Sequence, residues 1–299
     1  MKKLLLTLCL IIYPATSYAD SLQSVINKVY DKGSNKLEGF ILEEFFDGPG
    51  DTEISINTKD EHKPEISIMM VRPINIQEDR LSFYQLQLSN HSVIGDARQT
   101  INIGYGHRFL SSDKTRFVGV NTFFDHDIEK NSRLSIGAEL SYSGFQANGN
   151  YYKALSESHG AGNDVGGNQE RVLDGYDFNL VGQVPNAPWA SIVYTDYKWE
   201  AVKNEKDSQG RILKTELDLT NTVSLEAGYD KNNISKSMEF LKITYNYPGK
   251  DKPTMQDGIS EEAYQKSDVS DKMLTKVRRS NAITVEVEAS GVVIARGSN

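Results

Sequence analysis

Asp125, His126 and Asp127, in the string GVNTFFDHD, form an acid–histidine cluster. An imidazole beside carboxylates is a familiar general base. The string alternates like a β-strand, however, and a strand points successive side chains to opposite faces. We therefore expect His126 on the face opposite to both aspartates, which separates the parts of a proton relay. No serine has a recognisable nucleophile context, so we expect no catalytic residues and no enzyme.

Metal and cofactor sites are not predicted either. The other histidines, at positions 62, 91, 107 and 159, form no i, i+2 or i, i+4 pair that could hold a metal ion. The single cysteine, Cys9, lies in the N-terminal apolar stretch, so no thiolate site or disulfide framework is expected beyond it. The glycine-rich string GAGNDVGG at 160–167 lacks a following lysine or helix, which favours a surface loop over a phosphate site.

The charge balance is acidic, with 33 Lys and Arg against 41 Asp and Glu. This balance argues against a nucleic-acid partner, because phosphate binding needs a basic surface. Mean hydropathy is −0.49, which alone is typical of a soluble protein. A membrane barrel gives the same average, however, because its polar lumen side cancels its apolar lipid side.

The N-terminus resembles a secretory signal peptide at residues 1–19. Lys2 and Lys3 precede an apolar stretch at 4–13, and small residues precede the expected cleavage after Ala19. The apolar stretch is too short to span a bilayer. The chain is therefore predicted to be exported, with a lead-in at 20–51 that contains short amphipathic pieces.

From Thr52 onward the hydrophobic period is two. The clearest case is 133–143, where Leu134, Ile136 and Leu140 share one face while Arg133 and Glu139 share the other. A face that carries Glu139 must contact water. The same pattern predicts twelve strands, at 52–58, 65–74, 81–90, 98–109, 116–127, 133–143, 145–155, 175–183, 189–200, 213–219, 223–230 and 238–247.

These strands favour a transmembrane β-barrel over a soluble antiparallel sandwich or lipocalin-like barrel. Their number is even, most approach the ~9–11 residues that cross a tilted barrel wall, and the long polar connections at 156–174 and 201–212 fall on one end. The polar face is rich in Gly, Asn, Ser and Gln, whereas a soluble sandwich exposes a heavily charged face. The expected lumen-facing residues include Arg133, Glu139, Asn148, Glu216 and Glu226.

Six strings, in order, carry a resemblance to a known family. They are GVNTFFDHD at 119–127, RLSIGAEL at 133–140, NYY at 150–152, DGYDF at 174–178, PWA at 188–190 and LEAGYD at 225–230. With this order and spacing the chain resembles the β-domain of the inverse autotransporters, the intimin/invasin family. The resemblance spans 52–287, and its barrel motif falls on Gly119, Asn121, Phe123 and Asp125.

The resemblance implies an all-β fold: a twelve-stranded antiparallel barrel in the bacterial outer membrane with a periplasmic N-terminus. After the last strand the chain would form a short periplasmic helix and thread outward through its own lumen. Residues 260–266 and 270–276 are the expected helical turns, each with a serine N-cap. The string VRRSNAITVEV resembles the family linker, with its motif on Val277, Arg279, Asn281, Ile283 and Glu286.

Two details of the lumen follow from this picture. Arg278 and Arg279 are expected to pair with inward carboxylates such as Glu139, Glu216 or Glu226. Gly104 and Gly106, in the string GYGH, are expected to clear lumen space for the linker rather than to bind a nucleotide.

The predicted organisation is a signal peptide at 1–19, a lead-in at 20–51, a barrel at 52–248, and a helix and linker at 249–299 without a passenger. The predicted function is a membrane anchor and translocator related to adhesins. The alternatives are a small porin-like channel and, less favoured, a barrel hydrolase. The expected partners are outer-membrane lipid and, during biogenesis, the barrel-assembly machinery and periplasmic chaperones; the residues identify no host receptor and no cofactor.

Overall fold

The computed structural model describes residues 46, 49–59, 64–93, 96–160, 169–203, 206–264, 267–288 and 292–295. The predicted signal peptide and nearly all of the predicted lead-in lie outside these residues. The chain divides into two compact units, 1–47 and 48–299, and the second unit contains every element below.

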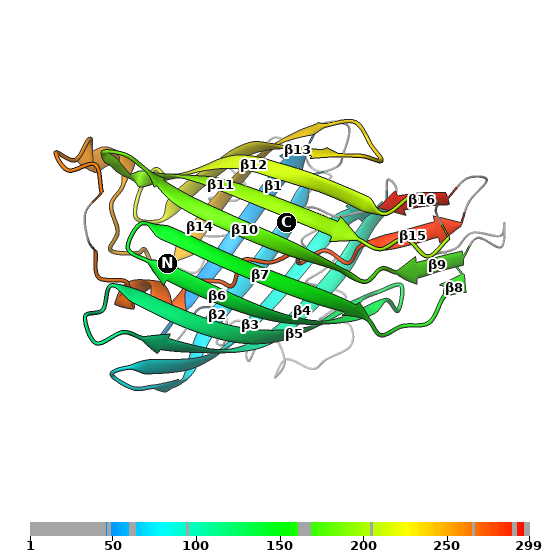
Figure 1. The fold of residues 1–299 in the computed structure, drawn as a ribbon, viewed down its shortest axis with the longest axis horizontal. Helices are drawn as coiled ribbons and strands as arrows, with labels where there is room; N and C mark the ends of the chain where they lie inside the picture. Colours follow the sequence, from blue (N-terminus) through cyan, green and yellow to red (C-terminus); the bar gives the residue numbers. More distant parts are fainter. Residues whose placement is uncertain are drawn as a thin grey trace. The chain divides into compact units, whose positions relative to one another are not determined.

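Twelve antiparallel strands close into a barrel, as predicted (Figure 1). Each predicted segment overlaps one barrel strand, and β1 pairs with β14 to complete the closure. The strand predicted at 213–219 begins earlier, at Ser208, so the predicted connection 201–212 is shorter than expected. Closure pairs the edges that an open sheet would leave free. The barrel strands are β1 (Asp51–Lys59), β2 (Glu65–Ile76), β3 (Arg80–Val93), β4 (Asp96–Leu110), β5 (Arg116–Asp127), β6 (Ser132–Tyr142), β7 (Phe145–Ala154), β10 (Gly175–Val184), β11 (Ala187–Trp199), β12 (Ser208–Asp218), β13 (Val223–Asn232) and β14 (Met238–Tyr247).

The barrel is apolar outside and polar inside. On β6, Ile136 is 59% exposed whereas Arg133 is 0% exposed, and on β5 Val120 and Asp125 show the same contrast. A soluble barrel places its apolar face toward the interior, because burial of that face drives folding in water. An outward apolar face is stable only in a medium that does not penalise it, so the pattern is that of a barrel surrounded by lipid.

The two ends of the barrel differ in their connections. One end, called here the turn end, has the connections 77–79, 111–115, 143–144, 185–186 and 219–222. The other, the loop end, has 60–64, 94–95, 128–131, 155–174, 200–207 and 233–237. Tyr142 and Phe145 pair directly across the tight turn formed by Ser143 and Gly144. Ser143 has φ 48° there, in the left-handed region that short hairpin turns require.

A second, four-stranded sheet lies at the loop end and was not predicted. Its order is β16–β15–β9–β8, and Figure 1 shows it at one end of the barrel in red and green. The sequence interpretation assigned 156–174 entirely to a loop, but two strands form there. That assignment was wrong because each strand is too short to show a period of its own. The strands are β8 (His159–Gly160), β9 (Gln169–Val172), β15 (Val285–Glu288) and β16 (Val292–Ala295).

The turns that follow β14 are 3₁₀ rather than α-helical. They are η1 (Met255–Asp257) and η2 (Ser270–Leu274), so the second predicted helical turn is present in part and the described portion of the first, 260–264, is a bend. Ser270 is not an N-cap, because η2 begins at Ser270 after Val269 and has no side-chain cap bond. Among the described residues, no helix has the length and apolar character needed to cross a bilayer.

Candidate functional site: the lumen and its linker

The lumen is occupied by the chain's own C-terminal part. Residues 277–288, called here the linker, run inside the barrel from the turn end to the loop end (Figure 1, orange to red). At the turn end, η2 precedes the linker, and at the loop end the linker becomes β15. The inward side chains of β3 to β7 and β10 supply most of the contacts along this path.

Apolar packing and one arginine hold the linker at the turn end. Val269, Met273 and Val277 are buried in a cluster with side chains of the surrounding wall: Met69, Val71, Leu81, Phe83, Phe117 and Phe123. Arg108 on β4 donates to the carbonyl oxygens of Met273, at 2.7 Å, and Thr275, at 2.8 Å. Because its other donors bind Glu139 on β6 at 2.7 and 2.9 Å, this guanidinium joins η2 to the wall.

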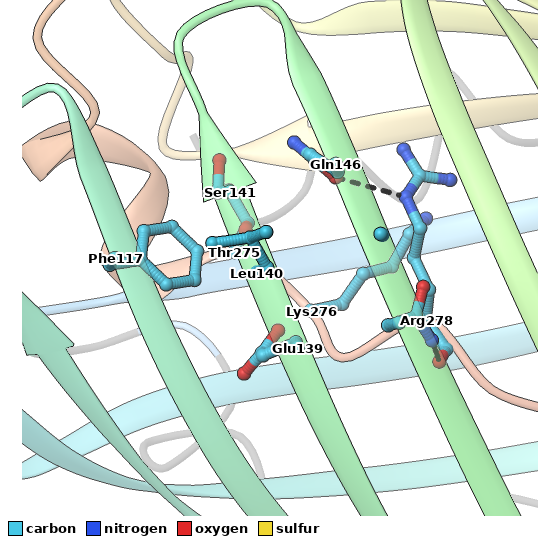
Figure 2. Close-up of a pocket in the computed structure, with 10 residues that line it drawn as sticks. Phe117, Glu139, Leu140, Ser141, Gln146, Thr275, Lys276 and Arg278 are labelled. Carbon is cyan, nitrogen blue, oxygen red and sulfur yellow. Dashed lines mark hydrogen bonds between the residues drawn. The ribbon is translucent and has the colours of Figure 1, made fainter.

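Arg278 crosses the lumen to the opposite wall. Its two terminal nitrogens each lie 2.6 Å from an oxygen of Glu216 on β12. Its Nε donates to Gln146 at 3.3 Å (Figure 2). A two-pronged pair of this kind fixes both position and orientation. Lys276 extends the same contact region to Glu53 on β1, at 2.6 Å.

Of the three carboxylates expected to receive the linker arginines, only Glu216 does so. Glu139 is occupied by Arg108, and Glu226 binds Lys214 at 2.5 Å and Lys242 at 3.1 Å. These carboxylates were expected as alternatives, and the linker arginines use Glu216 alone among them. A nearby cation does not decide the choice, because Lys214 also lies 2.9 Å from Glu216. Sequence alternation places all these groups inward but does not assign their pairs.

Arg279 binds a carboxylate of the family motif instead. Its nitrogens lie 2.9 and 2.6 Å from the two oxygens of Asp125 on β5, and a third contact reaches Ser135 at 3.0 Å. Arg133 on β6 binds the same Asp125 at 2.8 Å, and the side chains of all three charged residues are fully buried. The guanidinium of Arg279 also stacks 4.3 Å from the ring centroid of Phe123.

The linker backbone is satisfied by side chains of the wall. Carbonyl oxygens in the linker accept bonds from Asn148 and Asn150 on β7, from Arg133 on β6 and from Asn102 on β4. The amide of Val277 donates to Gln85 at 2.9 Å, and that of Ser280 donates to the Tyr152 hydroxyl at 2.7 Å. The wall's own backbone groups are paired within the barrel, so only its side chains can serve the linker.

The glycines of GYGH and of the family motif make room for wall side chains. A Cβ on Gly104 would lie 2.2 Å from the ring of Phe123, and one on Gly106 would lie equally close to Phe83. A Cβ on Gly119 would lie 2.6 Å from an oxygen of Glu139. These glycines therefore clear space for the groups that hold the linker, not for the linker backbone itself. Asn121, the remaining motif residue, points inward and is buried.

At the loop end the linker meets the connections of the barrel. Ile283, Val285 and Val287 form a buried cluster with Val172 of β9, and Ala154 packs against it. The fully buried carboxylate of Glu286 accepts bonds from the backbone amides of Val202, at 3.3 Å, and Lys203, at 2.9 Å. Deeper in the lumen, Asn281 contacts both Arg279, through its side chain, and Asn102, through its carbonyl.

A small cavity of about 20 Å³ remains between the linker and the wall (Figure 2). Its lining includes Phe117, Glu139, Gln146, Lys276 and Arg278. A cavity of this size holds about one water molecule.

The acid–histidine cluster is divided between the two faces of β5. Asp125 and Asp127 are buried on the inside, whereas His126 is half-buried on the outside, with Nδ1 2.9 Å from Ser132 Oγ. The imidazole thus has no contact with either neighbouring carboxylate. Within the described part of the chain, no group of three or more His, Cys, Asp or Glu side chains is placed to hold a metal ion.

Several residues that hold the linker were not identified from the sequence. They are Gln85, Asn102, Arg108, Tyr152 and Asp177. All occupy inward positions of alternating strands, so the period of two marks them as lumen-facing. It does not distinguish them from inward residues that do not contact the linker, because that choice depends on the linker path.

Comparison with known proteins agrees with this architecture. A family model described as inverse autotransporter, beta-domain, matches residues 14–281. An attaching and effacing protein homolog of Escherichia coli (strain K12) is 29% identical over 189 residues, which cover 60% of this chain and 61% of the relative. This chain thus spans less than two thirds of the length of that relative.

A solved membrane-protein chain, described under "Unveiling the Mechanism Behind the in-meso Crystallization of Membrane Proteins", has a similar fold. Its TM-score is 0.63 at 21% identity, and the match covers 80% of this chain and 100% of that chain.

Proposed function

Because this chain belongs to the inverse autotransporter β-domain family, we propose that its barrel anchors the chain in the bacterial outer membrane and exports the segment attached to its linker. The chain is an outer-membrane β-barrel with an apolar surface toward lipid. The proposal concerns three points: export through the lumen, which end of the barrel faces outside, and where the C-terminal end of the linker lies.

The observation that carries the proposal is the continuous engagement of the linker from one end of the barrel to the other. Arg108 holds the residues just before the linker, Arg278 and Arg279 bind opposite walls midway, and β15 pairs with β9 at the loop end. A segment that follows the linker therefore emerges at the loop end. In this proposal the loop end faces the outside and the turn end, where β1 begins, faces the periplasm.

With regard to attachment to another surface, we propose only that the barrel displays an attached segment. The E. coli relative is named an attaching and effacing protein homolog, and a barrel of this design would hold an attached segment at the cell surface. The barrel-assembly machinery and periplasmic chaperones are the proposed partners during insertion. We propose no catalysis, since His126 and the two aspartates point to opposite faces of β5.

An epitope tag placed after Asn299 tests the topology. On intact cells the tag is expected to bind antibody, and a tag placed after Asp20 in the same chain is expected to bind only after permeabilisation. Labelling of the C-terminal tag only after permeabilisation would refute outward threading. Labelling of both tags on intact cells would refute the proposed periplasmic N-terminus.

A further inference from the structure

The linker leaves the lumen as a strand paired with a loop of the barrel. β15 is antiparallel to β9, with Val285 opposite Val172 and Glu288 opposite Gln169. The amide of Leu173 continues the contact by donating to the carbonyl of Thr284 at 3.1 Å. The exit thus uses strand addition, a mode in which backbone bonds give affinity and side chains give register.

β9 is itself fixed to the barrel by a buried carboxylate. Glu170 is 1% exposed, and its two oxygens accept bonds from Arg98 on β4 at 2.5 and 2.9 Å. Asn131, in the neighbouring connection, donates to the same carboxylate at 2.5 Å. Asp127 binds both Arg98 and Asn131, so Glu170 joins a network that belongs to the barrel rim.

A second loop holds the other side of the exit. Glu286 is enclosed by the amides of Val202 and Lys203, in the connection between β11 and β12. That connection is tied to the barrel because Asp207 accepts a bond from the Ala201 amide at 2.9 Å and pairs with Lys198 at 2.8 Å. Two separate loops, the β7–β10 connection that contains β9 and the β11–β12 connection, therefore bind the linker at its exit.

We propose that β9 is a docking strand that captures the linker as it leaves the lumen, with Glu170 as the positioning residue that fixes β9 on the rim. Glu286 is the captured side chain, and the amides of Val202 and Lys203 receive it. The arrangement keeps an exported linker from sliding back into the lumen. The proposal rests on the outward threading proposed above, because it assigns the docked state to the exported end.

Hydrogen–deuterium exchange of the full chain in lipid nanodiscs tests the docking. Glu170→Ala is expected to raise the exchange rate of the 285–288 amides by about tenfold or more, because loss of a buried charge-assisted contact frees the strand that pairs with them. Glu157→Ala, the same change at an exposed site on the same loop, is the control and should leave that rate unchanged. Glu170→Gln keeps one acceptor oxygen and should restore part of the protection.

A second pair of variants does not touch the rim. Glu286→Ala should also speed exchange at 285–288 and at Val202 and Lys203. Glu288→Ala is its control on the same strand, because Glu288 is partly exposed and makes only longer pairs with Arg171 and Lys203. If Glu170→Ala does not fold, the comparison of exchange at 285–288 between Glu286→Ala and Glu288→Ala tests the docking by itself.

Faster exchange confined to the linker exit and its two loops, with β5 and β6 unchanged, would support the docking strand. Unchanged protection at 285–288 in both Glu170→Ala and Glu286→Ala would overturn it. The topology is read separately by the tag after Asn299. A surface-exposed tag with unchanged exchange would refute docking alone, whereas a tag that never reaches the surface would refute the proposed function.

Discussion

Arg133 of the barrel wall and Arg279 of the linker bind the same carboxylate, that of Asp125, and the side chains of all three are 0% exposed. Both guanidinium groups also lie near the ring of Tyr152, at 4.3 and 5.5 Å. The Tyr152 hydroxyl in turn donates to Asp177, which also accepts a bond from the linker amide of Ser280 at 3.2 Å. The centre of the lumen is thus a shared, dry ion network in which linker and wall complete each other.

Asp125→Ala should destabilise the folded barrel strongly. Removal of one partner from a buried ion pair costs about 3–5 kcal/mol, because the remaining charge stays buried without compensation, and here two arginines would be left. The free energy of unfolding, measured by urea titration in detergent micelles, checks this. Asp196→Ala breaks the exposed pair with Arg211 and should cost about 1 kcal/mol or less. Equal losses in the two variants would contradict the network.

Deletion of 277–299 should open the lumen to ions. In the intact chain the linker runs through the lumen and binds side chains on opposite walls, so its single-channel conductance in planar bilayers should be small. The deletion variant should conduct far more, because the linker and its contacts are gone. A large conductance in the intact chain would favour the porin-like alternative. Heat-modifiable migration on gels should verify that the deletion variant still forms a barrel.

Gly104→Ala should displace the ring of Phe123 and thereby weaken the seat of Arg279. A Cβ there would lie 2.2 Å from the ring, and overpacking of this kind costs about 1–3 kcal/mol. Gly149→Ala is the matched control, since its Cβ would have no neighbour closer than 3.7 Å. Unfolding titrations of both variants should separate them. If Gly104→Ala is as stable as Gly149→Ala, Gly104 is not needed for close packing.

Ile136→Lys should be costly because Ile136 faces the lipid near the middle of β6. A lysine at the bilayer midplane of a barrel costs about 2–4 kcal/mol, whereas near the interface the cost falls to about 0–1 kcal/mol. Tyr142→Lys, at the turn end of the same outward face, is therefore the control. Unfolding in lipid vesicles should show a larger loss for Ile136→Lys. Little or no loss for Ile136→Lys would contradict a lipid-facing position.

Much of the barrel follows from local patterns. Consecutive barrel strands are mostly neighbours in the sequence, so the period of two and the connecting turns define both the strands and their pairing. The pairing of β9 with β15 is different, because these strands are far apart in the chain and each has four residues. No local signal joins QERV to VEVE, so this contact could not be predicted.

The sequence by itself determined that Arg133, Glu139, Glu216 and Glu226 share an inward face, because alternation is a property of the extended backbone. Only the tertiary structure decided that Arg278 pairs with Glu216 and that Arg279 pairs with Asp125. In a closed lumen each carboxylate has several cations within reach, and the pairs that form depend on the path of the linker and on charges from non-adjacent strands. Those distances exist only after the barrel has closed around the linker.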